Sequence, residues 1–207
     1  MSIDIEIIRK NRYKTSEWSG GRTTELYIYP KDSQYRSRNF KWRLSSAKVE
    51  AEQSTFTSLP EINRLIMVIE GELFLKHEGH HNSLLKEFEQ DSFSGDWTTT
   101  SRGRVTDFNL MMAQGCKGKL DAISINKGEY KDILLNNLQA EEFSKRTEAF
   151  YIVKGNVEIV ADEEKKINLS HGDLALVNLI DKEDKSVIKL CNSPNEEAKI
   201  IRASIFY

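Results

Sequence analysis

Histidine and cysteine are the residue types in this chain that most readily bind metals or act as nucleophiles, and both are scarce. Three of the four histidines crowd into one short segment, whereas His171 stands apart beside a predicted turn. Glu78 is the one carboxylate at an obvious chelating register with that segment. We therefore interpret His77, His80 and His81 as a solvated loop in preference to a metal site, and predict neither a metal nor another cofactor.

The two cysteines, Cys116 and Cys191, have no CxxC spacing and no histidine partner, so we expect reduced thiols. Lys117 and Lys119 could lower the pKa of Cys116, but an ordinary thiol is the simpler interpretation. No serine, cysteine and histidine follow a hydrolase pattern, and no glycine-rich phosphate loop occurs. The sequence therefore favours a binding protein over an enzyme.

The charge balance argues against two classes of partner. The chain has 30 basic and 32 acidic residues, a net charge of −2, so no basic field invites nucleic acid or an anionic membrane. No signal peptide and no long apolar run precede or interrupt the polar pattern. We expect a cytoplasmic protein.

The elements that would position any site read as short β-strands. Segments rich in β-branched and aromatic residues alternate with turn residues; in 40–46, apolar Phe40, Trp42 and Leu44 alternate with polar residues. Helical periodicity is weak and confined to 130–146. The fold class is therefore all-β, a sandwich or a barrel.

An internal repeat is the most informative feature. Residues 64–75 resemble residues 148–159, 84 positions later, and each copy places one glycine, Gly71 or Gly155, between two apolar strands. We expect that glycine to form a tight hairpin. A Gly-Asp pair follows each copy, at 95–96 and at 172–173.

Such a repeated unit resembles the cupin half-barrel, so the chain resembles a bicupin with two jelly-roll barrels. We place the boundary near the Gly-Cys-Lys-Gly-Lys segment, giving an N-terminal lobe of residues 1–116 and a C-terminal lobe of residues 117–207. In cupins a glutamate seven residues before the glycine binds metal together with histidines. Here that position holds Arg64 in the first copy and Glu148 in the second, and neither copy keeps the histidines. The resemblance therefore implies a cupin that has lost its metal site, with the second lobe as scaffold.

Five short segments, all between residues 18 and 111, resemble marks of the HutD/Ves family. Each is weak alone, but their order and spacing together are fairly specific. In chain order these segments are Trp18–Glu25, Trp42–Ala47, Phe56–Arg64, Phe93–Asp96 and Asp107–Met111.

The cupin resemblance places Arg64 inside the first barrel. A buried guanidinium cannot lose its proton and needs an anion, which Asp107, Glu25 or a ligand carboxylate could supply. Asn109 shares a strand face with Asp107, and Trp42 is either core or a ligand wall. The predicted ligand-binding residues are Arg64, Asp107, Asn109, Trp42, Glu25 and Thr23.

The family resemblance implies a small-molecule binding protein with a regulatory role in histidine utilisation or stress responses. A small carboxylate or a formylated amino acid would suit an arginine-anchored pocket. Two alternatives stay open: a metal-independent cupin enzyme acting on a small carboxylate, and a purely structural module. A homodimer is also left open.

Overall fold

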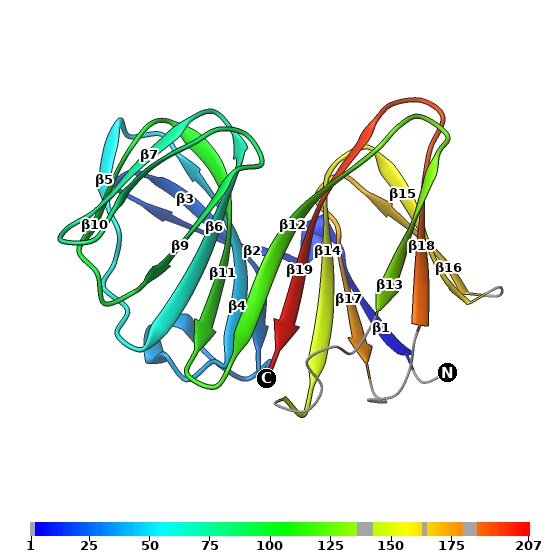
Figure 1. Cartoon of the computed structure of the whole chain (residues 1–207), viewed down its shortest axis with the longest axis horizontal. Helices are drawn as coiled ribbons and strands as arrows, with labels where there is room; N and C mark the ends of the chain where they lie inside the picture. Colours follow the sequence, from blue (N-terminus) through cyan, green and yellow to red (C-terminus); the bar gives the residue numbers. More distant parts are fainter. Residues whose placement is uncertain (1–2, 136–142, 163–164, 180–185) are drawn as a thin grey trace. The chain divides into compact units, whose positions relative to one another are not determined.

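The computed structural model describes residues 3–135, 143–162, 165–179 and 186–207, and in these ranges the regular structure is almost entirely β-strand (Figure 1). Two short 3-10 helices, η1 (Lys10–Arg12) and η2 (Tyr35–Ser37), are the exceptions. The weak helical periodicity at 130–146 was misleading where the structure describes it, since Tyr130–Leu135 form a strand. Positions 136–142 lie outside the described residues. Within the described ranges, no helix is long and apolar enough to cross a membrane.

The chain divides into two compact units. The N-unit comprises residues 13–118, and the C-unit comprises residues 1–12 together with residues 119–207. This grouping differs from the expected division into 1–116 and 117–207 at the N-terminus. The first strand, β1 (Ile3–Ile8), pairs antiparallel with β17 (Leu174–Leu179) of the C-unit. Its isoleucines at 3, 5 and 7 pack against the core of that unit, so burial of apolar surface holds the segment there.

The N-unit consists of two antiparallel sheets. One has six strands in the order β2-β3-β4-β11-β6-β9, and the other has four in the order β5-β10-β7-β8; both sheets are open. The strands are β2 (Lys14–Trp18), β3 (Gly21–Tyr29), β4 (Trp42–Val49), β5 (Gln53–Thr55), β6 (Ile62–Glu70), β7 (Leu73–His77), β8 (Asn82–Leu85), β9 (Gln90–Ser94), β10 (Thr99–Arg102) and β11 (Val105–Ala113).

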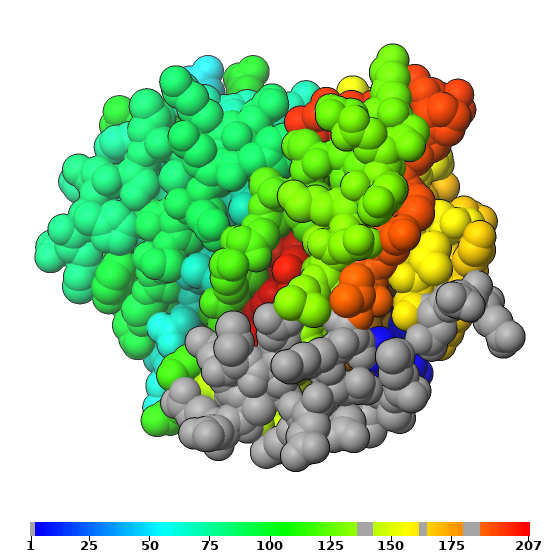
Figure 2. Space-filling model, turned by 45° about the vertical axis from the view of Figure 1, so that its right-hand side comes forward, coloured from blue at the N-terminus to red at the C-terminus, as the bar shows by residue number. Residues whose placement is uncertain are grey.

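The C-unit repeats this two-sheet arrangement. Its five-stranded sheet has the order β1-β17-β14-β19-β12, and its four-stranded sheet the order β13-β18-β15-β16. In the space-filling view of Figure 2, the yellow-green β13 and the orange β18 lie side by side at the surface, as their pairing requires. The remaining strands are β12 (Lys117–Ile125), β13 (Tyr130–Leu135), β14 (Arg146–Lys154), β15 (Asn156–Asp162), β16 (Lys165–Ser170), β18 (Ser186–Asn192) and β19 (Ala198–Phe206).

The repeated glycine has a different role from the expected hairpin. Strands β6 and β7 belong to different sheets, and so do β14 and β15, so the chain crosses between sheets at Gly71 and at Gly155. Both glycines have positive φ, +92° and +86°. A Cβ on Gly71 would lie 2.6 Å from the Arg104 carbonyl oxygen, so the crossing has no room for a side chain.

The second mark of the repeat was assigned to the wrong residues in the N-unit. The turn that corresponds to Gly172-Asp173 is Phe88-Glu89, and not Gly95-Asp96. The Phe88 amide donates to the Val68 carbonyl, and the Gly172 amide donates to the equivalent Ile152 carbonyl. Glu89 and Asp173 each accept a side-chain hydrogen bond from the backbone amide three residues before them. Phe88 has a φ of +64° and Gly172 a φ of +88°. Phe88 therefore adopts the same left-handed backbone conformation although it is not a glycine.

The same 84-residue offset therefore relates the two units through this whole segment. Sequence comparison missed the turn because backbone conformation is shared there while residue type is not.

Candidate functional site

A row of polar side chains lies on one face of the six-stranded sheet of the N-unit. Strand residues alternate between faces, so cross-strand pairing decides which side chains share one. In β11, Met111 is paired with Arg64 of β6 and with Arg43 of β4, and Asn109 is paired with Ser45. The buried polar residues on this face are Arg43, Ser45, Arg64, Asp107 and Asn109.

Arg64 is buried, with 5% of its surface exposed, and no described residue forms a hydrogen bond or an ion pair with its guanidinium. The guanidinium instead faces two aromatic rings, 4.6 Å from the Phe56 centroid and 5.0 Å from the Phe93 centroid. Burial lowers the pKa of Arg64 to about 10, so the side chain remains a cation at neutral pH. A buried cation with an unsatisfied Nε is the feature expected of an anion-binding residue.

Two further groups on this face are incompletely satisfied. Burial raises the pKa of Asp107 to about 7, against the opposing effects of Arg64 and of a hydrogen bond from the Ala47 amide. Asn109 keeps its Oδ1 buried without a hydrogen-bond partner among the described residues. The expected internal bridge between Arg64 and Asp107 is thus not formed as a hydrogen-bonded ion pair.

Glu25 has another partner, which the sequence did not single out. Its Oε2 accepts a hydrogen bond of 2.8 Å from Nε of Arg43, whose Nη1 donates to Ser45 Oγ at 3.1 Å. The Arg43 guanidinium also lies 4.5 Å from the Tyr35 ring centroid. The available sequence signal for Arg43 was its place among the polar residues of the 40–46 alternation. In the structure, the face that carries these polar residues is the interior one.

Trp42 lies on the opposite face of the sheet from this site, whereas Thr23 lies on the same face as the site. Trp42 precedes Arg43 in β4, so it faces the opposite side of the sheet, where it is buried and stacked with Tyr27 and Tyr29 at 5.3 and 5.5 Å. The core interpretation of this residue therefore fits, and the ligand-wall interpretation does not. Thr23 is paired with Ala47 and is partly buried.

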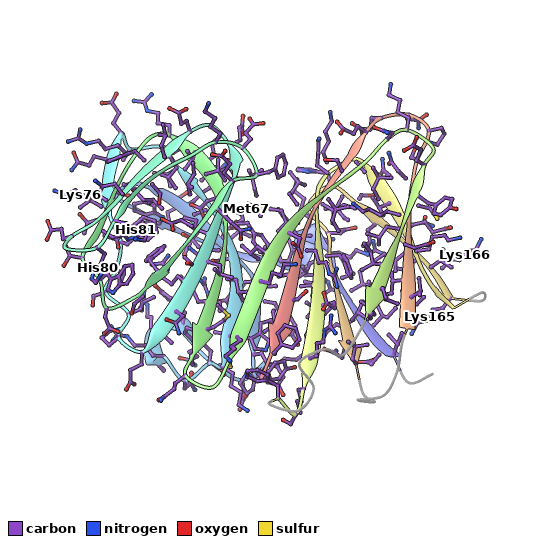
Figure 3. The ribbon with its side chains drawn as sticks, in the orientation of Figure 1. Met67, Lys76, His80, His81, Lys165 and Lys166 are labelled. Atoms are coloured by element: carbon purple, nitrogen blue, oxygen red, sulfur yellow. The ribbon has the colours of Figure 1, made fainter. Side chains whose placement is uncertain are left out.

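The histidines at 77, 80 and 81 are not simply a solvated loop. His77 is 2% exposed, and its Nε2 lies 3.1 Å from Oδ2 of Asp91, a carboxylate of β9 that sequence spacing could not reveal. His81 Nε2 lies 3.0 Å from the same carboxylate, and His80 stacks on Trp97 with 3.7 Å between ring centroids. Figure 3 shows His80 and His81 beside each other at the turn that follows β7.

In the C-unit, the equivalent of Arg64 is the fully buried Glu148, and its hydrogen bonds are saturated. Its Oε1 accepts from Arg146 Nε at 2.7 Å, and its Oε2 accepts from Arg202 Nε at 2.6 Å and from Ser204 Oγ at 2.7 Å. This carboxylate is therefore occupied by internal partners and has no capacity left for a ligand or a metal.

A surface pocket of about 380 Å³ lies at the turn between β2 and β3. None of the six predicted ligand-binding residues contributes to it. The residues around it are Glu17, Trp18, Ser19, Gly20, Gly21, Arg22, Glu50 and Ala51.

The fold of the protein is cupin-like, and solved structures share it. A single-residue mutant of oxalate decarboxylase from Bacillus subtilis superposes with a TM-score of 0.68 at 7% identity, over 97% of this chain and 76% of that one. A conserved protein of unknown function from Pseudomonas aeruginosa PAO1 gives a TM-score of 0.81 at 22% identity, over 99% of this chain and all of that one.

The particular family follows from the sequence model described as HutD, which matches residues 10–190, most of the chain. The protein therefore belongs to the HutD family. The solved HutD from Pseudomonas fluorescens SBW25 is similar over 98% of both chains, with a TM-score of 0.70 and 20% identity.

Proposed function

We propose that this protein binds a small carboxylate, or a formylated amino acid, inside the N-unit through Arg64. The observation that carries the proposal is a buried guanidinium that no described residue pairs with. A guanidinium recognises a carboxylate through parallel N–H donors, and removing it from water without such a partner is costly. Asn109 Oδ1 adds an unsatisfied acceptor, which suits an N–H group on the same ligand.

The names of two similar structures fit this ligand chemistry. The HutD structure from Pseudomonas fluorescens was obtained in a formate condition, and the structure of oxalate decarboxylase from Lactobacillus farciminis, with a TM-score of 0.70, is a formate complex. Formate is the smallest carboxylate and is therefore the first probe for this chain. By family resemblance, urocanate, formiminoglutamate and formylglutamate are the larger probes.

Isothermal titration calorimetry with these four compounds tests the proposal. We expect at least one to bind, and Arg64→Gln to weaken it about 10- to 100-fold, the loss typical of a charged hydrogen bond. Arg104→Gln is the matched control, since Arg104 is an exposed arginine of the same unit. Absence of heat with all four compounds, or equal affinity in Arg64→Gln, would contradict the proposal.

We also propose that Asp107 sets the pH dependence of this binding. Its raised pKa of about 7 means that it is largely protonated below pH 7 and ionised above it. An ionised Asp107 repels an incoming carboxylate, so affinity should fall as the pH rises through 7. Calorimetry at pH 6 and pH 8 should show this fall in the wild type and not in Asp107→Asn.

The same carboxyl supports the second candidate function, a metal-independent enzyme acting on a small carboxylate. A general base works best when its pKa lies near the operating pH, as that of Asp107 does. Turnover that survives exhaustive chelation and is lost in Asp107→Asn would favour this candidate over a binding protein. A broad screen that yields no turnover, with ligand binding retained, would favour the binding protein.

We further propose that the two units are duplicated cupin units, one for recognition and one as scaffold. Equivalent sheet crossings at Gly71 and Gly155, and equivalent turns at 88–89 and 172–173, support the duplication. In this proposal ligand occupancy of the N-unit has a regulatory role, as the family resemblance implies. The saturated Glu148 supports the scaffold role of the C-unit.

A further inference from the structure

Three side chains of the N-unit bring metal-binding atoms together at one end of its two sheets. His77 ends β7, His81 precedes β8, and Asp91 belongs to β9, so the three come from both sheets. The turn between the histidines closes with a hydrogen bond from the His77 amide to the His81 carbonyl. One ligand atom from each residue lies within 4.8 Å of the others. We propose that His77, His81 and Asp91 form a binding site for a divalent transition-metal ion, with zinc as the best fit.

The distances suit a tetrahedral ion. Zinc binds imidazole nitrogen and carboxylate oxygen at about 2.0–2.2 Å, which puts tetrahedral ligand atoms about 3.3 Å apart. Nε2 of His77 and Nε2 of His81 lie 3.1 and 3.0 Å from the Asp91 carboxylate. Two of the three distances between ligand atoms are therefore close to the tetrahedral value, and all three lie within 4.8 Å. Two imidazoles and one carboxylate leave a fourth position open to water or a small ligand.

The second hydrogen-bonding atom of His77 is held as metal-binding histidines usually are. Its Nδ1 lies 2.8 Å from Thr99 Oγ1, and Thr99 Oγ1 in turn contacts the Trp97 carbonyl oxygen at 3.4 Å. When the threonine hydroxyl donates to that carbonyl, Nδ1–H of His77 donates to Thr99. In that tautomer Nε2 carries no proton and can bind a metal, whereas without a metal Nε2–H can instead donate to the Asp91 carboxylate 3.1 Å away.

The surroundings provide both shielding and access. The Phe93 ring packs against His77 with 4.6 Å between centroids, and Trp97 contacts all three histidines. The His77 side chain is fully buried, whereas the His81 side chain is 41% exposed, so an ion can enter from the His81 side.

The fold itself does not require these residues. The equivalent positions in the C-unit hold Ala161 for His77, Lys165 for His81 and Ala175 for Asp91, and both alanines are buried. Figure 3 labels both His81 and Lys165. Two buried alanines of the C-unit thus stand at the positions where the N-unit has an imidazole and a carboxylate.

Zinc titration of the full chain, stripped with a chelator and dialysed, tests the site. We expect one equivalent to bind and to raise the melting temperature. His81→Ala is the primary variant because His81 is exposed enough to be replaced without harming the fold. It should weaken zinc at least about 10-fold, and Asp91→Asn should do the same. Thr99→Val, which leaves all three ligands in place, should weaken it about 10- to 100-fold.

His80→Ala is the matched control, because it removes a neighbouring histidine that is stacked on Trp97 and lies outside the cluster. It should leave the zinc affinity within about twofold. No zinc binding, an affinity unchanged in His81→Ala and Asp91→Asn, or an equal loss in His80→Ala would overturn the proposal. The first two results leave the three residues as a hydrogen-bonded network, and the third indicates adventitious binding by loop histidines.

The metal site and the carboxylate site can fail independently. They share Phe93 as a neighbour, since its ring contacts both Arg64 and His77. Arg64→Gln should therefore retain zinc binding while losing carboxylate binding. Loss of zinc binding in Arg64→Gln would contradict two separate sites.

Discussion

The interiors of the two units differ most at one equivalent position, the third residue of β6 in the N-unit and of β14 in the C-unit. Arg64 occupies it in the N-unit and Glu148 in the C-unit. Arg202 and Ser204 of β19, which hydrogen-bond to Glu148, correspond by strand register to Asn109 and Met111 of β11. The N-unit thus carries a buried charge without the partners that the C-unit supplies.

Apolar packing surrounds these polar positions in both units. A hydrophobic cluster of the C-unit includes Phe150, Ile152, Ala175 and Val177. Among the described residues of the N-unit, one cluster surrounds Ile66 and Val68 and another surrounds Phe40 and Leu59. Buried unpaired polar groups cost stability, so a unit that tolerates them is the one expected to bind ligands. The comparison supports the proposal that the C-unit serves as scaffold and the N-unit binds the ligand.

The largest expected effect is at Glu148 of the C-unit, whose hydrogen bonds are all made to internal partners. Glu148→Gln removes the carboxylate shared by Arg146 and Arg202 and leaves buried positive charge uncompensated. We expect the free energy of unfolding to fall by about 3–5 kcal/mol, measured by urea denaturation. Glu158→Gln is the control, because its ion pair with Lys166 is long and partly exposed, and it should change stability by less than about 0.5 kcal/mol. A loss below about 1 kcal/mol in Glu148→Gln would remove the scaffold interpretation.

The pH dependence of stability should distinguish the N-unit through Asp107. Its pKa is raised from 3.8 in the unfolded chain to about 7, so the folded chain binds more protons between these values. The contribution is fully present below pH 4 and is lost as the pH rises through 7. Each pKa unit corresponds to about 1.4 kcal/mol, which makes about 4 kcal/mol an upper bound.

Asp107→Asn isolates this contribution, since a neutral amide of the same size does not titrate. Urea denaturation at pH 5 and pH 8 should show a smaller fall in stability for the variant than for the wild type. The lowered pKa of His77 acts in the opposite sense below pH 6.5 and is common to both proteins. Equal pH profiles would show that Asp107 is not buried as an acid with a raised pKa.

Replacing Arg64 should change the stability of the protein in the opposite direction from replacing Glu148. Arg64→Met keeps the side-chain length and removes a buried charge that lacks a hydrogen-bonded partner. Without ligand, we expect the variant to be more stable by about 1–2 kcal/mol, net of the lost contacts with two aromatic rings. Thermal unfolding in ligand-free buffer measures this difference. A destabilised Arg64→Met would mean that the guanidinium braces the N-unit.

The smallest effect concerns the equivalent turns. Gly172 has φ of +88°, and alanine there should cost about 1–2 kcal/mol. Phe88 already occupies this region at +64°, so Phe88→Gly should change stability by less than about 1 kcal/mol or raise it. Urea denaturation of both variants compares the turns. A neutral Gly172→Ala would show that the positive φ is not required at this position of the repeat.

Much of the fold followed from local patterns in the sequence. Alternating apolar residues indicate an all-β chain, and the 84-residue repeat matches Arg64 to Glu148. Neither signal gives the partner of a strand. For this reason β1 was assigned with the N-terminal lobe, although its pairing with β17 places it in the C-unit.

The candidate site could be predicted only in part, for the same physical reason. The resemblance to cupins and to the HutD/Ves family singled out Arg64, Asp107, Asn109 and Glu25 in the sequence. Arg43 was missed because an alternating pattern defines two faces without telling which of them is the interior. Asp91 lies ten residues from His81 along the chain, at no metal-binding spacing that the sequence displays.

The sequence by itself determined that one copy of the repeat carries an arginine, Arg64, at the position where the other carries a glutamate, Glu148. Only the tertiary structure decided that this cation lacks a partner, that Trp42 faces the other side of the sheet, and that Asp91 meets the two histidines. The residue types are local properties of the chain. Their partners depend on strand order and register, which place residues distant in sequence within hydrogen-bonding distance.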